Sequence, residues 1–74
     1  EGSVIAPLTG LVTDVLVASG DRVEAGQTLA VMEAMKLVHS LTAPVSGTVA
    51  RVAVSAGDTV TQKTILIELE EEDA

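Results

Sequence analysis

The residue with the clearest chemical potential in this sequence is Lys36, which lies near the middle of the 74-residue chain in Glu33-Ala34-Met35-Lys36-Leu37. An amine is nucleophilic only when unprotonated, and free lysine side chains are mostly protonated at neutral pH. Another protein must therefore position such a lysine and remove its proton. The residue types indicate a modification site, whereas composition alone favours a solvated turn lysine.

The other polar candidates do not assemble into a catalytic site. His39 is the only histidine, and the chain has no cysteine. Without a nucleophile or a second metal ligand beside it, His39 cannot form a triad or a metal centre, so a surface or partly buried role is expected. Lys63 lies in a Thr-Gln-Lys-Thr turn and is expected to be structural. An enzyme is the weakest interpretation.

An internal repeat determines the elements that must position Lys36. A shift of 37 residues aligns apolar, glycine and turn positions throughout both halves: Ala6-Pro7 with Ala43-Pro44, Gly10 with Gly47, Gly20-Asp21 with Gly57-Asp58, Val23 with Val60, and Leu29 with Leu66. Two units are too few for a solenoid, so the repeat predicts a closed pair related by a pseudo-two-fold axis.

The periodicity within each half predicts short strands. Residues 49–54 and 65–69 alternate with a period of two, and Gly-Asp pairs supply the turns. Residues 29–37 are rich in helix formers, but the repeat aligns Leu29 with strand-like Leu66 and leaves about seven residues for the connection, which is too short for a stable helix. The halves are expected to meet in a hairpin at residues 34–37. Lys36 would then lie at its tip, on the symmetry axis and away from both termini.

Composition and charge exclude several classes of function. The chain is 47% hydrophobic without any aromatic residue, which suits thin β layers packed through aliphatic side chains. Its net charge of -7 and lack of aromatic residues argue against nucleic-acid binding. No apolar run approaches a membrane span, and a soluble, intracellular protein is expected. The acidic run Glu68, Glu70, Glu71, Glu72 and Asp73 is interpreted as a solvated, frayed end.

The motif around Lys36 resembles the attachment motif of the biotinyl domain family, in which Ala-Met-Lys is central. The resemblance covers residues 4–69 and includes Ala-Pro-x-x-Gly in both halves, the Gly-Asp turns and Val-Met-Glu-Ala-Met-Lys. It implies an all-β, flattened barrel or sandwich of two four-stranded antiparallel sheets. It also implies that biotin protein ligase transfers biotin from biotinyl-adenylate to Lys36. The carrier would then shuttle a carboxyl group between biotin carboxylase and carboxyltransferase.

The residues beside Lys36 receive provisional roles under this resemblance. Ala34, Met35 and Leu37 are candidates for ligase recognition, although Met35 could instead be a core residue. Glu33 is either a recognition residue or a solvated strand end. Leu37 departs from the family pattern, which usually has a second methionine, and slower or unchanged biotinylation is expected. A lipoyl carrier has Asp and Ala beside its lysine, and an unmodified interaction module lacks the lysine; both remain alternatives.

The resemblance also predicts a carboxylase type and a division of the chain. Both halves have the same length between Ala-Pro and Gly-Asp, so no room exists for the thumb of the bacterial acetyl-CoA carboxylase carrier. The sequence is most similar to the C-terminal domain of acyl-CoA carboxylase subunits of the methylcrotonyl-CoA type. Residues 1–3 are assigned to a linker or artificial remnant, 4–69 to the biotinyl domain and 70–74 to an acidic tail. A monomer in bacterial cytoplasm or mitochondrial matrix is expected.

Overall fold

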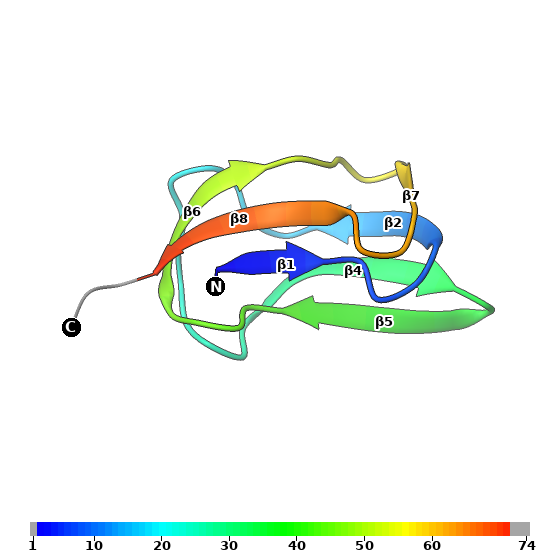
Figure 1. Ribbon diagram of the computed structural model, residues 1–74, viewed down its shortest axis with the longest axis horizontal. Coiled ribbons are helices and arrows are strands. Elements are labelled where there is room, and N and C mark those ends of the chain that lie inside the picture. Colours follow the sequence, from blue (N-terminus) through cyan, green and yellow to red (C-terminus); the bar gives the residue numbers. More distant parts are fainter. Residues whose placement is uncertain (1, 72–74) are drawn as a thin grey trace.

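The computed structural model describes residues 2–71, which form eight β-strands and no helix (Figure 1). Antiparallel pairing joins the strands into two facing sheets, one in the order β1-β8-β6-β3 and the other in the order β5-β4-β2-β7. The predicted all-β architecture of two four-stranded sheets is confirmed. The strands are β1 (Ser3–Ile5), β2 (Gly10–Val15), β3 (Arg22–Val23), β4 (Thr28–Ala34), β5 (Leu37–Thr42), β6 (Gly47–Val52), β7 (Thr59–Val60) and β8 (Ile65–Glu71).

The strands repeat the 37-residue period of the sequence. β2, β3 and β4 recur as β6, β7 and β8 at that offset, and each sheet takes two strands from either half. Pairing registers recur as well: Leu11 opposes Glu33 as Thr48 opposes Glu70. Both pairings contain a bulge at the same place, after Val12 and after Val49. The two halves are therefore related by the predicted pseudo-two-fold symmetry.

The Gly-Asp turns join the two halves through reciprocal hydrogen bonds. Gly20 N donates to Val49 O at 2.8 Å, and Val49 N donates to Asp21 O at 2.7 Å. In the repeat-related pair, Gly57 N donates to Val12 O at 2.7 Å, and Val12 N donates to Asp58 O at 2.8 Å. Both aspartates also cap their own turns, because Asp21 Oδ2 accepts from Ala18 N and Asp58 Oδ2 from Ser55 N. Each half thus needs the other half to satisfy its backbone.

The core between the sheets is entirely aliphatic. Leu29 and Met32, which helix propensity alone would place on one helical stripe, are fully buried on the inner face of β4. No polar or charged side chain is buried among residues 2–71. The repeat alignment was therefore a better guide here than helix propensity. The buried side chains are Val4, Ala6, Val12, Val23, Leu29, Ala30, Met32, Ala34, Leu41, Ala43, Val49, Val60, Leu66, Ile67 and Leu69.

Regular structure extends beyond residues 4–69 at both ends. β1 begins at Ser3 and pairs with β8, which continues to Glu71. Glu68, Glu70 and Glu71 are thus strand residues that pair with β6, and the expectation of a frayed end is wrong for this part of the acidic run. Backbone pairing with β6 outweighs the charge repulsion there. Glu72 and Asp73 lie outside the described residues. Nothing in residues 2–71 is a helix long and apolar enough to cross a membrane.

Replacement of Gly10 by alanine should destabilise the domain by about 2 kcal/mol or more. A Cβ at this position would collide with Glu33 O and lie 2.8 Å from Ala34 Cβ, so β2 or β4 must move. Urea unfolding of Gly10→Ala measures the loss. Ser40→Ala, on the exposed face of β5, is the control and should stay within about 0.5 kcal/mol of the wild type. A Gly10→Ala protein as stable as the control would contradict the close packing.

Candidate functional site

Met35 and Lys36 form a two-residue turn between β4 and β5, at the position that the repeat predicts. Both residues have positive φ, 54° for Met35 and 68° for Lys36. Positive φ at both central positions is the pattern of a type I′ hairpin turn, for which Asn-Gly is the preferred sequence. Two residues with Cβ atoms therefore occupy a left-handed conformation at a cost of about 1 kcal/mol or more each.

Close packing beneath the turn holds the hairpin against the body of the domain. Met32 and Ala34 on β4 are 0% and 4% exposed, and both face Gly10 on β2. An added Gly10 Cβ would lie only 3.0 Å from Met32 Cε, so only glycine allows this approach. On the other side, β5 continues the ladder up to the pair Ala34 and Leu37. The base of the turn is therefore rigid.

The side chains at the tip of the hairpin point into solvent. Met35 is 79% and Leu37 63% exposed, and Lys36 is exposed between them. Met35 is therefore not a core residue. Of the two roles considered for it, ligase recognition is the one that its exposure allows. Glu33 is also exposed, whereas Ala34 is buried. No residue within 2–71 forms a hydrogen bond or ion pair with the Lys36 amine, which leaves it available for modification.

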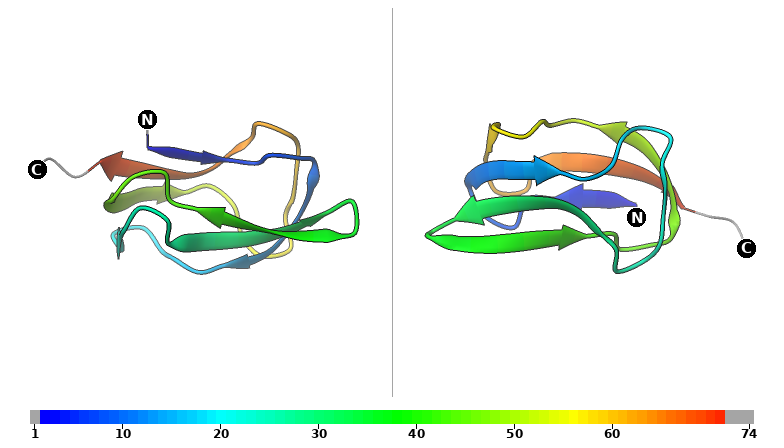
Figure 2. Two further views of the ribbon diagram at one scale, coloured as in Figure 1. Left: turned by 90° about the horizontal axis from the view of Figure 1, so that it is seen from below. Right: turned by 180° about the vertical axis from the view of Figure 1, so that it is seen from behind.

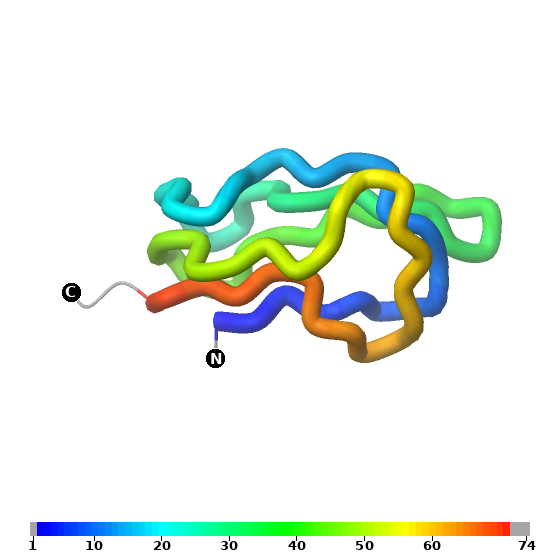
Figure 3. Tube along the Cα trace, turned by 90° about the horizontal axis from the view of Figure 1, so that it is seen from above, coloured from blue at the N-terminus to red at the C-terminus, as the bar shows by residue number. Residues whose placement is uncertain are grey.

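The hairpin tip lies far from the start of β1 and the end of β8, toward the other end of the molecule (Figure 3). The expectation that Lys36 is distant from the termini is confirmed for the two ends of the described chain. The expectation that it lies on the symmetry axis is wrong, because the 37-residue shift relates the hairpin to the end of β8 and the start of β1. Lys36 therefore has no repeat-related lysine, since the residue 37 positions further along the chain is Asp73.

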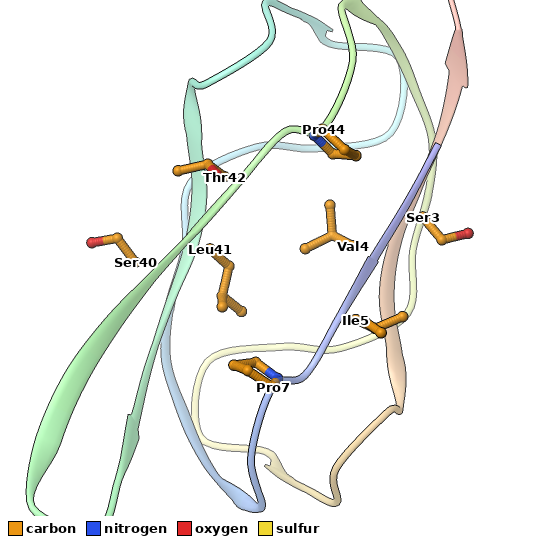
Figure 4. Close-up of a pocket in the computed structure, with 8 residues that line it drawn as sticks. All are labelled: Ser3, Val4, Ile5, Pro7, Ser40, Leu41, Thr42 and Pro44. Carbon is orange, nitrogen blue, oxygen red and sulfur yellow. The ribbon is translucent and has the colours of Figure 1, made fainter. Parts of the chain in front are cut away.

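A groove of about 270 Å³ lies between residues 3–7 of the first half and residues 40–44 of the second half (Figure 4). It separates the edge strands β1 and β5, and its lining consists of four pairs related by the repeat. It contains no charged side chain, and its polar groups are hydroxyls without an adjacent base, so it offers no catalytic chemistry. The pairs are Ser3 with Ser40, Val4 with Leu41, Ile5 with Thr42, and Pro7 with Pro44.

The other two residues considered in the sequence, His39 and Lys63, lie outside the hairpin tip. His39 is half-buried opposite Met32, and its Nε2 atom is buried without a hydrogen-bond partner. This agrees with the partly buried role expected for it. Lys63 has φ of 73° in the turn 61–64, where the first half has Gly26 with φ of 89°. No cluster of three potential metal ligands occurs in the described part of the chain.

The fold presents an exposed lysine at the tip of a hairpin, an arrangement that suits a small carrier domain. Comparison with known families supports this class. Residues 2–69 match the biotin/lipoyl family, whose description is "biotin-requiring enzyme". The chain therefore belongs to this family, and the resemblance noted in the sequence is confirmed.

Similar proteins of known sequence or structure include large carboxylases. Over 74 residues the chain is 43% identical to mitochondrial methylcrotonoyl-CoA carboxylase subunit alpha of Mus musculus, covering 100% of this chain and 10% of that protein. A single-chain, multi-domain long-chain acyl-CoA carboxylase has a TM-score of 0.88 and 35% identity over 96% of this chain and 7% of its own.

The lipoyl domain of the Azotobacter vinelandii 2-oxoglutarate dehydrogenase complex has the same fold. Its TM-score is 0.84 at 24% identity, and the match covers 99% of this chain and 100% of that domain. Identity this low shows a shared fold only. The chain thus corresponds to one domain of the carboxylases and to the whole of the lipoyl domain.

Replacement of the two turn residues by Asn-Gly should stabilise the domain, because this sequence adopts positive φ at little cost. We expect the Met35→Asn/Lys36→Gly protein to gain about 1–2 kcal/mol in the free energy of unfolding. Urea unfolding checks this value, with Lys36→Ala, which keeps a Cβ at the strained position, as the comparison. A double variant no more stable than Lys36→Ala would show that the turn is not strained.

Proposed function

We propose that Lys36 is the biotin attachment residue of this chain, which is a non-catalytic carboxyl carrier domain of the biotin-requiring family. The observation that carries the proposal is the two-residue turn that holds an exposed, unpaired lysine at strained φ on a rigidly packed hairpin. A turn that departs from its preferred sequence is maintained at a cost in stability, which a solvated surface lysine would not require.

The residues of the chain suit the attachment reaction. A biotin protein ligase would present biotinyl-adenylate, and the unprotonated Lys36 amine would attack its acyl carbon. An amide bond forms, AMP leaves and the ligase accepts the amine proton. The ring of the attached biotin would accept and carry the carboxyl group. The exposed amine has no partner to displace, and the buried residues Met32 and Ala34 keep the backbone fixed during the reaction.

Side chains next to Lys36 are available for recognition by the ligase. Met35 and Leu37 project into solvent, and Glu33 lies on the outer face of β4. We assign ligase recognition to these three residues. Ala34 is buried and acts by its small size, which permits the contact with Gly10.

The rigid hairpin also suits the transport of the attached group. The backbone fixes the attachment point, and the long lysyl side chain lets the biotin ring reach separate active sites at high effective concentration. On this proposal a biotin carboxylase loads the carrier and a carboxyltransferase unloads it. The similarity to methylcrotonoyl-CoA carboxylase favours an acyl-CoA as acceptor, with mitochondrial matrix or bacterial cytoplasm as the compartment. The net charge of -7 makes nucleic acid an unsuitable partner, and the domain is proposed to act as a monomer.

Intact mass after incubation with biotin protein ligase, ATP and biotin tests the proposal. We expect one biotin adduct on the wild type and on Lys63→Arg, and none on Lys36→Arg. Lys63 is the matched control, because it also lies in a turn at positive φ. An adduct on Lys36→Arg, or no adduct on a folded wild type beside an active ligase, would refute the assignment; in the second case a lipoate ligase would be tried next.

A further inference from the structure

The outer face of the sheet that contains the hairpin carries a row of directly paired residues. Glu33 on β4 opposes Leu11 on β2 and Val38 on β5, so these three side chains point to the same side. Figure 2, in its right panel, shows β2, β4 and β5 side by side in the view from behind. Val38 is 70% and Leu11 38% exposed, and Glu33 is exposed between them. We call Leu11, Glu33 and Val38 the Glu33 row.

The pseudo-two-fold symmetry provides an internal comparison for this row. In the other sheet, Thr48 occupies the position of Leu11, and Glu70 occupies that of Glu33. The next position along the row is Arg22 there and Thr59 in the hairpin sheet. Among the described residues, an exposed leucine thus stands beside Glu33 where a threonine stands beside Glu70; the counterpart of Val38 is Glu1, which lies outside the described residues. Neither the fold nor the core accounts for this difference, because the equivalent strand accepts threonine.

The next pair of residues along β2 and β4 also differs in charge from its counterpart on β6 and β8. Arg51 and Glu68 form an ion pair of 3.0 Å on the outer face of the other sheet. Their counterparts in the hairpin sheet are Asp14 and Val31, which oppose each other in register. No cation within the described residues pairs with Asp14 or Glu33. The face beside Lys36 is consequently apolar with unneutralised negative charge, and it is complementary to an apolar surface that carries positive charge.

Building on the proposed function, we propose that the Glu33 row docks the carrier on the active-site mouth of its biotin carboxylase. That enzyme joins biotin to bicarbonate with ATP, so the species reacting beside the biotin ring are anions and the site must be electropositive. In a carboxyltransferase the acyl-CoA thioester itself is uncharged, and the phosphates of the acyl-CoA lie at the distant end. The reacting negative charges there are one carboxylate and the enolate formed from the thioester, whereas the carboxylase assembles bicarbonate and a triphosphate together. The acidic, apolar face therefore matches the carboxylase better than the carboxyltransferase.

Steady-state kinetics with fully biotinylated carriers tests this surface. A purified biotin carboxylase that also accepts free biotin is supplied with ATP, bicarbonate and either the wild-type carrier or Leu11→Thr/Val38→Thr. Threonine occupies the position related to Leu11, and Val38 is 70% exposed, so the variant should fold. The matched control is Ile5→Thr/Ile65→Thr, an exposed aliphatic pair on the other sheet whose counterparts are Thr42 and Thr28. Intact mass confirms complete biotinylation of each carrier.

We expect the carrier KM of Leu11→Thr/Val38→Thr to rise about tenfold with kcat within about twofold, and the control to keep both constants. The wild-type KM should also increase with ionic strength, whereas that of free biotin should not. An unchanged KM, an equal rise in the control, or a rise confined to a carboxyltransferase assay would overturn the docking surface. A wild-type carrier that accepts no biotin would instead refute the proposed function, and the docking surface with it.

Discussion

The aliphatic interior is the constraint from which the rest of this structure follows. A chain of 74 residues without aromatic side chains fills the space between two sheets with valine, leucine, isoleucine, alanine and methionine. Such a core is only two layers thick and leaves no interior space for a polar site. All the chemistry of the domain must therefore occur on its surface, and the fold can contribute only position and rigidity to it.

The repeat supplies that rigidity and also the asymmetry on which function depends. Each half completes the hydrogen bonds of the other, as the bonds between Gly20 and Val49 and between Gly57 and Val12 show. The connection between the halves is a closed hairpin, while the equivalent place in the second half is the end of β8. Duplication thus yields one tip instead of two. A lysine at this tip therefore has no counterpart that the repeat places at the other end of the molecule.

The sequence predicts most of the fold because the repeat constrains it twice. The period of 37 residues, the Gly-Asp turns and the alternating aliphatic residues imply two sheets, and they overrule the helix propensity around Leu29 and Met32. The hairpin turn at Lys36 follows from the same alignment. The resemblance carried by Ala-Met-Lys, and not the periodicity, identifies biotin as the expected cofactor.

Other features depend on geometry that a linear pattern does not contain. The sequence shows Gly10 only as a repeated glycine, and its contact with the base of the hairpin requires the register between β2 and β4. The exposure of Leu11 and Val38 beside Glu33 likewise depends on strands distant in sequence. The expectation that Lys36 lies on the symmetry axis was wrong, because a repeat reveals symmetry without the direction of its axis. The burial of the His39 Nε2 atom without a hydrogen-bond partner also depends on contacts between strands, which the sequence does not show.

The central claim is that the domain presents Lys36 on a rigid hairpin without using it to fold. Backbone amide spectra of the ¹⁵N-labelled chain, recorded by NMR before and after treatment with biotin protein ligase, test this most directly. The account predicts shift changes confined to residues 33–38, with the resonances of β1, β6 and β8 unchanged. Changes spread through both sheets would contradict it, as would a spectrum in which the altered residues surround a lysine other than Lys36.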